Sequence, residues 1–219
     1  MANFATHLNV SAFVSGVLAA GVGYSGVVDL KDSLVLFFTG IVGGILPDID
    51  HDKSTPFKML QFFFSNLISF LVIVKYIGTY PILNLLIIWV SAYAGVVVFF
   101  YLFKKFTKHR GIIHSIPAAL LFSSLTALIS YDFFDTNIKK SYLLGLFLFI
   151  GYITHLLLDE VYSIDLTGKR LKKSFGSAFK LYSNNKLITL LFYSLIFLTI
   201  FLLPKKEVFF HIFKGLGNV

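Results

Sequence analysis

The chain has 219 residues, of which 57% are hydrophobic and 14% are charged, and its formal net charge is +8. Its mean hydropathy is +0.82, whereas about a quarter of the residues in a soluble domain are usually charged. A water-soluble fold of this length could not bury so much apolar surface, so we expect lipid to solvate much of it. The sequence contains no cysteine, which excludes disulfides and thiolate metal ligands.

Seven hydrophobic stretches follow one another along the chain, separated by polar segments. The first has no basic start and no small-residue cleavage site, so we expect a membrane span and not a cleaved signal peptide. The second is short and rich in glycine, which favours close helix packing. The pattern predicts an all-α, polytopic membrane helix bundle of six or seven spans, forming a single integral membrane domain over 1–219. The expected spans are 8–28, 33–46, 59–77, 82–103, 115–130 (with Ser115 as N-cap), 141–158 and 187–203.

Histidines and carboxylates gather at the ends of these stretches. His155 and Asp159 are four residues apart near the end of the sixth stretch, so in a helix they project from one face. A nitrogen donor beside an anionic oxygen donor is a pair that zinc and manganese sites use. The other clusters are His7, then Asp48, Asp50 and His51 within 47–52, and then His109, Arg110 and His114 within 109–115.

Counting the expected crossings brings these clusters to the same side of the membrane. His7 begins on one side, and the polar segments 47–58, 104–115 and 159–186 all return to it. Five of the six histidines therefore lie on that side, with only His211 on the other. Twelve of the nineteen basic residues also lie there, so the positive-inside rule predicts that the histidine side is cytoplasmic.

Taken singly, each cluster also fits an ordinary membrane protein. His7 alone fits an interfacial histidine, and 47–52 fits a solvated turn. His155 with Asp159 fits a neutral hydrogen-bonded pair at a helix end, and 104–115 fits a basic juxtamembrane loop. Taken together, the clusters favour a metal site, because ionisable groups at membrane depth are costly and usually functional. The crowded carboxylates of 47–52 would also repel one another unless a cation neutralised them.

The donor types suggest the metal and its chemistry. Imidazoles and carboxylates without thiolates suit Zn²⁺ or Mn²⁺ better than Mg²⁺ or Ca²⁺. The candidates outnumber the four ligands of one structural zinc, so we expect two or more ions, with Asp48 or Asp50 as a bridge and a water activated as nucleophile. Arg110 would bind a phosphate through its bidentate fork. The expected metal ligands are His7, Asp48, Asp50, His51, His109, His114, His155 and Asp159, and the expected catalytic residues are Asp50, Arg110 and His114.

A basic segment, 166–182, follows the sixth stretch. Its cations alternate with Leu171, Phe175, Phe179 and Tyr182 at approximately helical spacing. This pattern predicts an amphipathic interfacial helix that binds anionic lipid. An alternative is that the segment steers a lipid-linked phosphate into the site. Nucleic acid is not favoured as a partner, because bilayer contact explains the aromatic residues better.

Three motifs, preceded by His7, resemble the YdjM-type bacterial membrane-bound metal-dependent hydrolases. They are LPDIDH at 46–51, HRGIIHS at 109–115 and GYITHLLLD at 151–159. The resemblance covers about 3–182, leaving a C-terminal span and tail at 187–219. That family is distantly similar to the zinc-dependent phospholipase C and P1 nuclease group, which are helical phosphoesterases with clustered zinc ions. The resemblance implies metal ligands at the eight positions named above.

The resemblance and the donor set together imply a metal-dependent hydrolase of the bacterial inner membrane. We expect it to cleave a phosphoester of a phospholipid or another lipid-linked substrate at the cytoplasmic face. One alternative is a metal ion transporter or sensor, which would need a polar path deep through the bilayer; the expected spans contain few polar residues for one. Another is a membrane adaptor in which the metal is structural.

Overall fold

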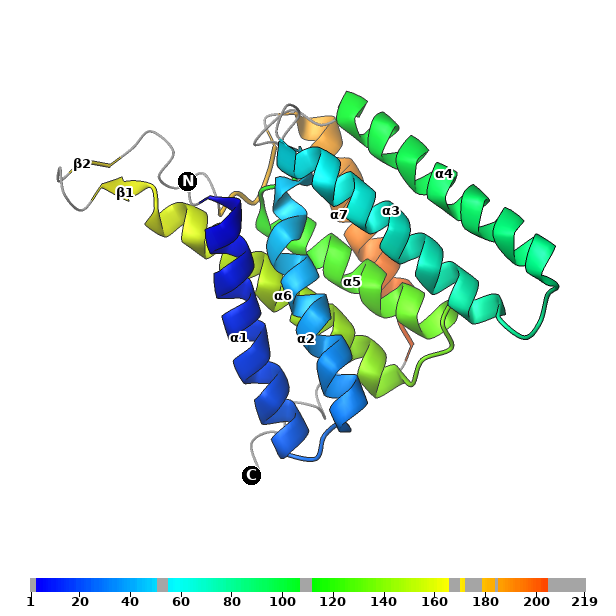
Figure 1. Ribbon diagram of the computed structural model, residues 1–219. Coiled ribbons are helices and arrows are strands. Elements are labelled where there is room, and N and C mark those ends of the chain that lie inside the picture. The colour runs from blue at the N-terminus through cyan, green and yellow to red at the C-terminus, as the bar shows by residue number, and fades with distance from the viewer. Residues whose placement is uncertain are drawn as a thin grey trace. The chain divides into compact units, whose positions relative to one another are not determined.

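The computed structural model describes residues 3–50, 55–106, 112–165, 170–171, 179–183 and 185–204. Over these ranges the chain is almost entirely helical (Figure 1), which confirms the all-α prediction. Each α-helix coincides with one predicted stretch to within about one turn at each end, whereas the short 3-10 helix η1 was not predicted. The helices are α1 Phe4–Tyr24, α2 Leu30–Ile45, the 3-10 helix η1 Leu46–Asp50, α3 Thr55–Tyr76, α4 Ile82–Phe106, α5 Ile116–Asp132, α6 Ile138–Val161 and α7 Lys186–Leu202.

Within the described ranges, four helical stretches are long and apolar enough to cross a membrane, judged by length and composition: Phe4–Tyr24, Leu30–Asp48, Ile82–Tyr101 and Ile138–Val161. The remaining apolar stretches are shorter, at 10–17 residues, and a 17-residue helix of roughly 25 Å is near the lower limit for a span. Large apolar side chains such as Phe13 and Phe197 are 73% exposed. Lipid contact accounts for such outward faces, so a helical membrane bundle fits the structure.

Contacts within the chain divide it into two compact units, 48–110 and the remainder, 1–47 with 111–219. In the smaller unit α3 and α4 form a helical hairpin, in which Phe64 stacks on Phe100 with ring centroids 6.3 Å apart. The turn between them includes Gly78 at a φ of +84°, a backbone conformation that favours glycine. The expectation of a single domain stays a prediction.

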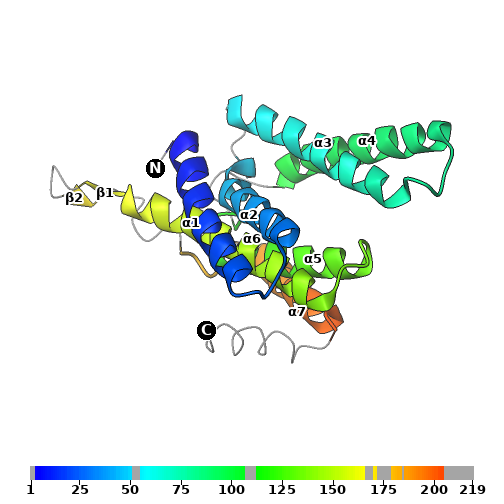
Figure 2. The ribbon, with the colours of Figure 1, turned by 60° about the horizontal axis from the view of Figure 1, so that its bottom comes forward.

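The larger unit is built around α6. This helix packs against α1, α2 and α5, and α7 packs on α5 (Figures 1 and 2). Among the four candidate spans α6 is the most buried, at 67%. Its Leu143 and Phe147 join Leu36 of α2 in the hydrophobic core. Because α6 is packed on several sides, its polar residues His155 and Asp159 are held among the neighbouring helices.

Glycines bring the backbones of α2 and α6 into direct contact. A Cβ atom on Gly43 would overlap the backbone carbonyl of Leu148, and one on Gly151 would overlap the carbonyl of Gly40. Such close approach is typical of small residues between membrane helices. The prediction that the glycine-rich second stretch packs closely is therefore confirmed.

The predicted interfacial helix over 166–182 is wrong where the structure describes this segment. Strand β1, Ile164–Asp165, pairs antiparallel with β2, Arg170–Leu171, and Lys180 forms a parallel bridge with Ser115. Turn-forming Thr and Gly residues lie between the two strands and favour a chain reversal over a helix. The remainder of the segment, 166–169 and 172–178, lies outside the described residues.

The glycine contact predicts a specific loss of stability. Gly43→Ala should destabilise the protein by about 1–3 kcal/mol, because an added methyl group meets backbone atoms that cannot rotate away. Thermal unfolding of the detergent-purified chain measures the effect. Gly21→Ala in α1 is the matched control, since nothing lies within 4 Å of its added Cβ and alanine favours helix. Equal melting temperatures for the two variants would contradict the close contact.

Candidate metal centre

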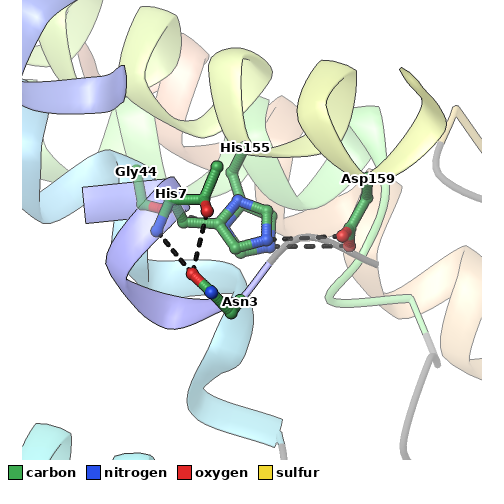
Figure 3. Close-up of polar contacts among 6 residues, drawn as sticks. Asn3, His7, Gly44, His155 and Asp159 are labelled. Carbon is green, nitrogen blue, oxygen red and sulfur yellow. Dashed lines mark hydrogen bonds and ion pairs between the residues drawn. The ribbon is translucent and has the colours of Figure 1, made fainter. Parts of the chain in front are cut away.

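Side chains from two helices that are far apart in sequence, α1 and α6, meet at one end of the larger unit (Figure 3). His7 of α1 and His155 and Asp159 of α6 place ligand atoms within 4.8 Å of one another. His7 Nε2 lies 3.3 Å from Asp159 Oδ1, and His155 Nε2 lies 3.7 Å from Asp159 Oδ2. The three residues are 2%, 0% and 8% exposed. Two imidazoles therefore direct a nitrogen at one buried carboxylate.

The N-terminus of α1 positions His7. The Asn3 side chain caps the helix by accepting from the backbone N–H and the hydroxyl of Thr6, both at 2.8 Å (Figure 3). The His7 N–H donates to the Asn3 carbonyl at 3.1 Å. This cap fixes the first turn, and the His7 ring stacks on that of His155 with centroids 3.7 Å apart and an angle of 12°.

Gly44 of α2 orients His155. The distance from His155 Nδ1 to the Gly44 carbonyl oxygen is 2.7 Å, and because a carbonyl only accepts, Nδ1 carries the hydrogen. The lone pair is then on Nε2, the nitrogen that faces Asp159. Metal-binding histidines are commonly oriented in this way. A Cβ at Gly44 would overlap the side chain of Ser11, so glycine allows α1 to lie close at this point.

A third histidine lies beside this group. His114 is 4% exposed, and its ring meets that of His155 at an angle of 64° with centroids 5.7 Å apart. It belongs to the turn before α5. Ser115 caps that helix by accepting from the Ala118 N–H at 3.4 Å, as the sequence predicted.

The structure describes some of the predicted site residues and leaves others outside the described ranges. It brings His7, His114, His155 and Asp159 together in the larger unit. Asp48 and the backbone of Asp50 are in η1, in the smaller unit, and the Asp50 side chain is not described. His51, His109 and Arg110 lie outside the described residues. The Gly44 carbonyl and the Asn3 cap were not predicted, because only the contacts between helices reveal them.

The donor geometry is compatible with a bound cation. The 3.7 Å between His155 and Asp159 is too long for a hydrogen bond. Ligand atoms about 2 Å from a tetrahedral zinc ion stand roughly 3.3 Å apart, which matches the distance from His7 Nε2 to Asp159 Oδ1. His7 Nδ1 is buried with no hydrogen-bond partner among the described residues. The group of His7, His155 and Asp159 can therefore hold a metal ion.

This geometry predicts metal that purifies with the protein and depends on His155. His155→Ala should lower the bound metal per chain severalfold, because it removes a buried ligand at the centre of the group. Elemental analysis of the detergent-purified chain measures metal content. His211→Ala is the control, since the sequence predicts that His211 lies across the membrane. Equal metal content in wild type and His155→Ala would contradict this site.

Comparison with known proteins adds one match. The family model described as YdjM inner membrane protein matches residues 1–213, which includes α7 as well as the motifs. No curated protein and no solved structure is significantly similar to the chain. Nearly the whole sequence is covered by the family match, and the apolar helices agree with a membrane location. The chain belongs to the YdjM family of inner membrane proteins.

Proposed function

We propose that this chain is a multi-pass inner-membrane hydrolase that uses bound metal to cleave a phosphoester of an amphiphilic substrate. The observation that carries the proposal is the buried meeting of His7, His155 and Asp159, whose ligand atoms lie within 4.8 Å. Membership of an inner membrane protein family supports the location. The more distant similarity to zinc-dependent phospholipase C and P1 nuclease stays a prediction.

The donor set supports zinc, with manganese as the alternative, because two imidazoles and a carboxylate suit these ions. A second ion would draw its ligands from the motifs at 46–51 and 109–115. Those ligands, Asp48, Asp50, His51 and His109, are proposed from the sequence and the family resemblance alone. When bound, the metal would lower the pKa of a coordinated water towards neutrality and polarise a phosphoryl oxygen.

In the proposed reaction the side chains bind and orient. Arg110 binds the phosphate through two parallel hydrogen bonds and stabilises the negative charge that develops in the transition state. Asp50 orients the attacking water if it is outside the ligand set. His114, edge-on to His155, is the described imidazole nearest the three-ligand group and is proposed as a further ligand of the bound metal.

The position of His7 and His155 near the ends of their helices favours a substrate that is embedded in the membrane. His155 is six residues before the end of α6 and His7 is three residues after the start of α1, or roughly 9 Å and 5 Å along the helices. In a hydrocarbon layer about 30 Å thick, such positions lie near the lipid–water boundary. Phosphates of lipid headgroups lie at that boundary, within reach of the proposed site.

Transport is less well supported. The buried face of α1 carries His7, Ser11 and Ser15, but it continues with Ala19 and Val22. This polar stripe therefore stops part of the way along the helix, whereas a transporter needs a polar path to the far side.

A structural metal is the second candidate, because ligands that are at most 8% exposed resemble a closed site. Chelation would then lower the melting temperature strongly, and the metal-loaded protein would hydrolyse none of the substrates tested. Measuring melting and turnover on the same samples separates this candidate from the hydrolase.

The hydrolase proposal predicts metal-dependent turnover. The full chain in nanodiscs, loaded with Zn²⁺ or Mn²⁺, should release phosphate or headgroup from at least one member of a panel of phospholipids and lipid phosphates. Chelation should abolish release, and Arg110→Ala should lower it by about a hundredfold, as for loss of a group that binds transition-state charge. Lys31→Ala is the control, because the counted crossings place Lys31 on the opposite side of the membrane. Inactivity of the metal-loaded protein across the panel would refute the proposal.

The proposed orientation predicts labelling from one side. The chain has no cysteine, so single cysteines can be introduced at Tyr24, which is 91% exposed, and at Tyr182, which is 70% exposed. With the histidine side cytoplasmic, a membrane-impermeant maleimide added to intact cells should label Tyr24→Cys and not Tyr182→Cys. The reverse pattern would place the site on the periplasmic side.

A further inference from the structure

Tyr152 of α6 links the helix that carries His155 to the turn that carries His114. It is fully buried and lies one turn before His155. Its hydroxyl donates to the backbone carbonyl of Ile113, the residue that precedes His114. Its ring stacks on Phe122 of α5, with centroids 6.1 Å apart and an angle of 22°. The Tyr152 side chain therefore holds the Ile113 carbonyl, in a segment that is distant in sequence.

The segment around His114 depends on such outside contacts. It has no helix or strand of its own over 112–114, and it is a short turn at the entrance of α5. The Ile113 carbonyl also accepts from the Ser115 N–H at 2.9 Å, and the Ile116 N–H donates to the Lys180 carbonyl at 3.2 Å. The Tyr152 hydroxyl ties the backbone of this turn to α6, where the His114 ring also meets that of His155.

The Ile113 carbonyl is an effective point at which to fix His114. A peptide group is planar, so the direction of this carbonyl also sets the direction of the His114 N–H. Tyr152 and His155 are three residues apart on a rigid helix, which makes them neighbours along its surface. The Tyr152 hydroxyl therefore fixes the backbone at His114 relative to the helix that carries the His155 ring.

We propose that Tyr152 is a positioning residue that holds His114 against His155 in the metal centre. This inference rests on the proposed function, and it assigns a role to a residue outside both the ligand set and the predicted catalytic set. Partners that orient metal ligands commonly contribute about ten- to a hundredfold to metal affinity.

A purely structural role for the hydroxyl is the competing explanation, since buried tyrosine hydroxyls usually find a partner. The chain provides a matched comparison on the same helix. Tyr142 donates its hydroxyl to the Pro204 carbonyl at 2.9 Å, ten residues and roughly 15 Å before Tyr152. Replacing either tyrosine by phenylalanine removes one hydroxyl-to-carbonyl hydrogen bond, but only one of them is beside His114.

The test compares Tyr152→Phe with Tyr142→Phe in the full chain in nanodiscs. The first measurement is hydrogen exchange of metal-free protein in chelator, read on peptides covering 112–119. Exchange there should be faster in Tyr152→Phe and unchanged in Tyr142→Phe. The second is titration with Co²⁺, followed by its visible absorption. Tyr152→Phe should bind Co²⁺ about tenfold more weakly and with an altered spectrum, whereas Tyr142→Phe should match wild type.

Each outcome supports or overturns the inference. Unchanged exchange over 112–119 in Tyr152→Phe overturns it, whatever the metal result. Faster exchange with wild-type Co²⁺ affinity and spectrum also overturns it, because the turn would then be held without positioning a ligand. Equal changes in both variants indicate a general loss of stability and overturn it as well. If wild type itself binds no Co²⁺, the proposed function fails, and with it the positioning role.

Discussion

The hydrogen bond between His155 and the Gly44 carbonyl is the constraint on which the candidate metal centre depends. It joins α2 to α6 at 2.7 Å and determines which ring nitrogen faces Asp159. The bond requires α2 and α6 to lie in backbone contact, which Gly43 and Gly151 allow. α1 also passes close to Gly44, and the small side chain of Ser11 permits this. The small residues that let these helices pack closely therefore also determine how the His155 ring is oriented in the site.

Burial explains why the group needs a counter-ion. Asp159 lies among helices with little access to water, and an ionised carboxylate in such surroundings is costly unless it is paired. The surrounding imidazoles can offer hydrogen bonds or, with a cation, a shared electrostatic partner. The ligand atoms of His7, His155 and Asp159 lie close enough together to hold a cation. The same buried charge therefore bears both on the stability of the fold and on the proposed chemistry.

Much of this arrangement could be predicted from the sequence, and the reasons are physical. Apolar run lengths determine the helices, and a four-residue spacing puts His155 and Asp159 on one face. Counting crossings then predicts that His7 lies at the same end. The Gly44 carbonyl and the Tyr152 hydroxyl could not be predicted, because a backbone acceptor has no sequence signature. Helical spacing misled at 170–171, where a turn-forming Thr-Gly pair and strand pairing outweighed the periodicity of four apolar side chains.

The bridge between Ser115 and Lys180 has a consequence for biosynthesis. The turn that carries His114 makes its last backbone contact with a residue that is synthesised sixty-five positions later. His7 emerges first, yet it has no partner until α6 has been made, and the entrance of α5 is not complete until the chain beyond α6 has folded back. During membrane insertion the candidate ligands therefore come together only after α6 has been made. A partly synthesised chain thus carries His7 without the two candidate ligands of α6 that it faces.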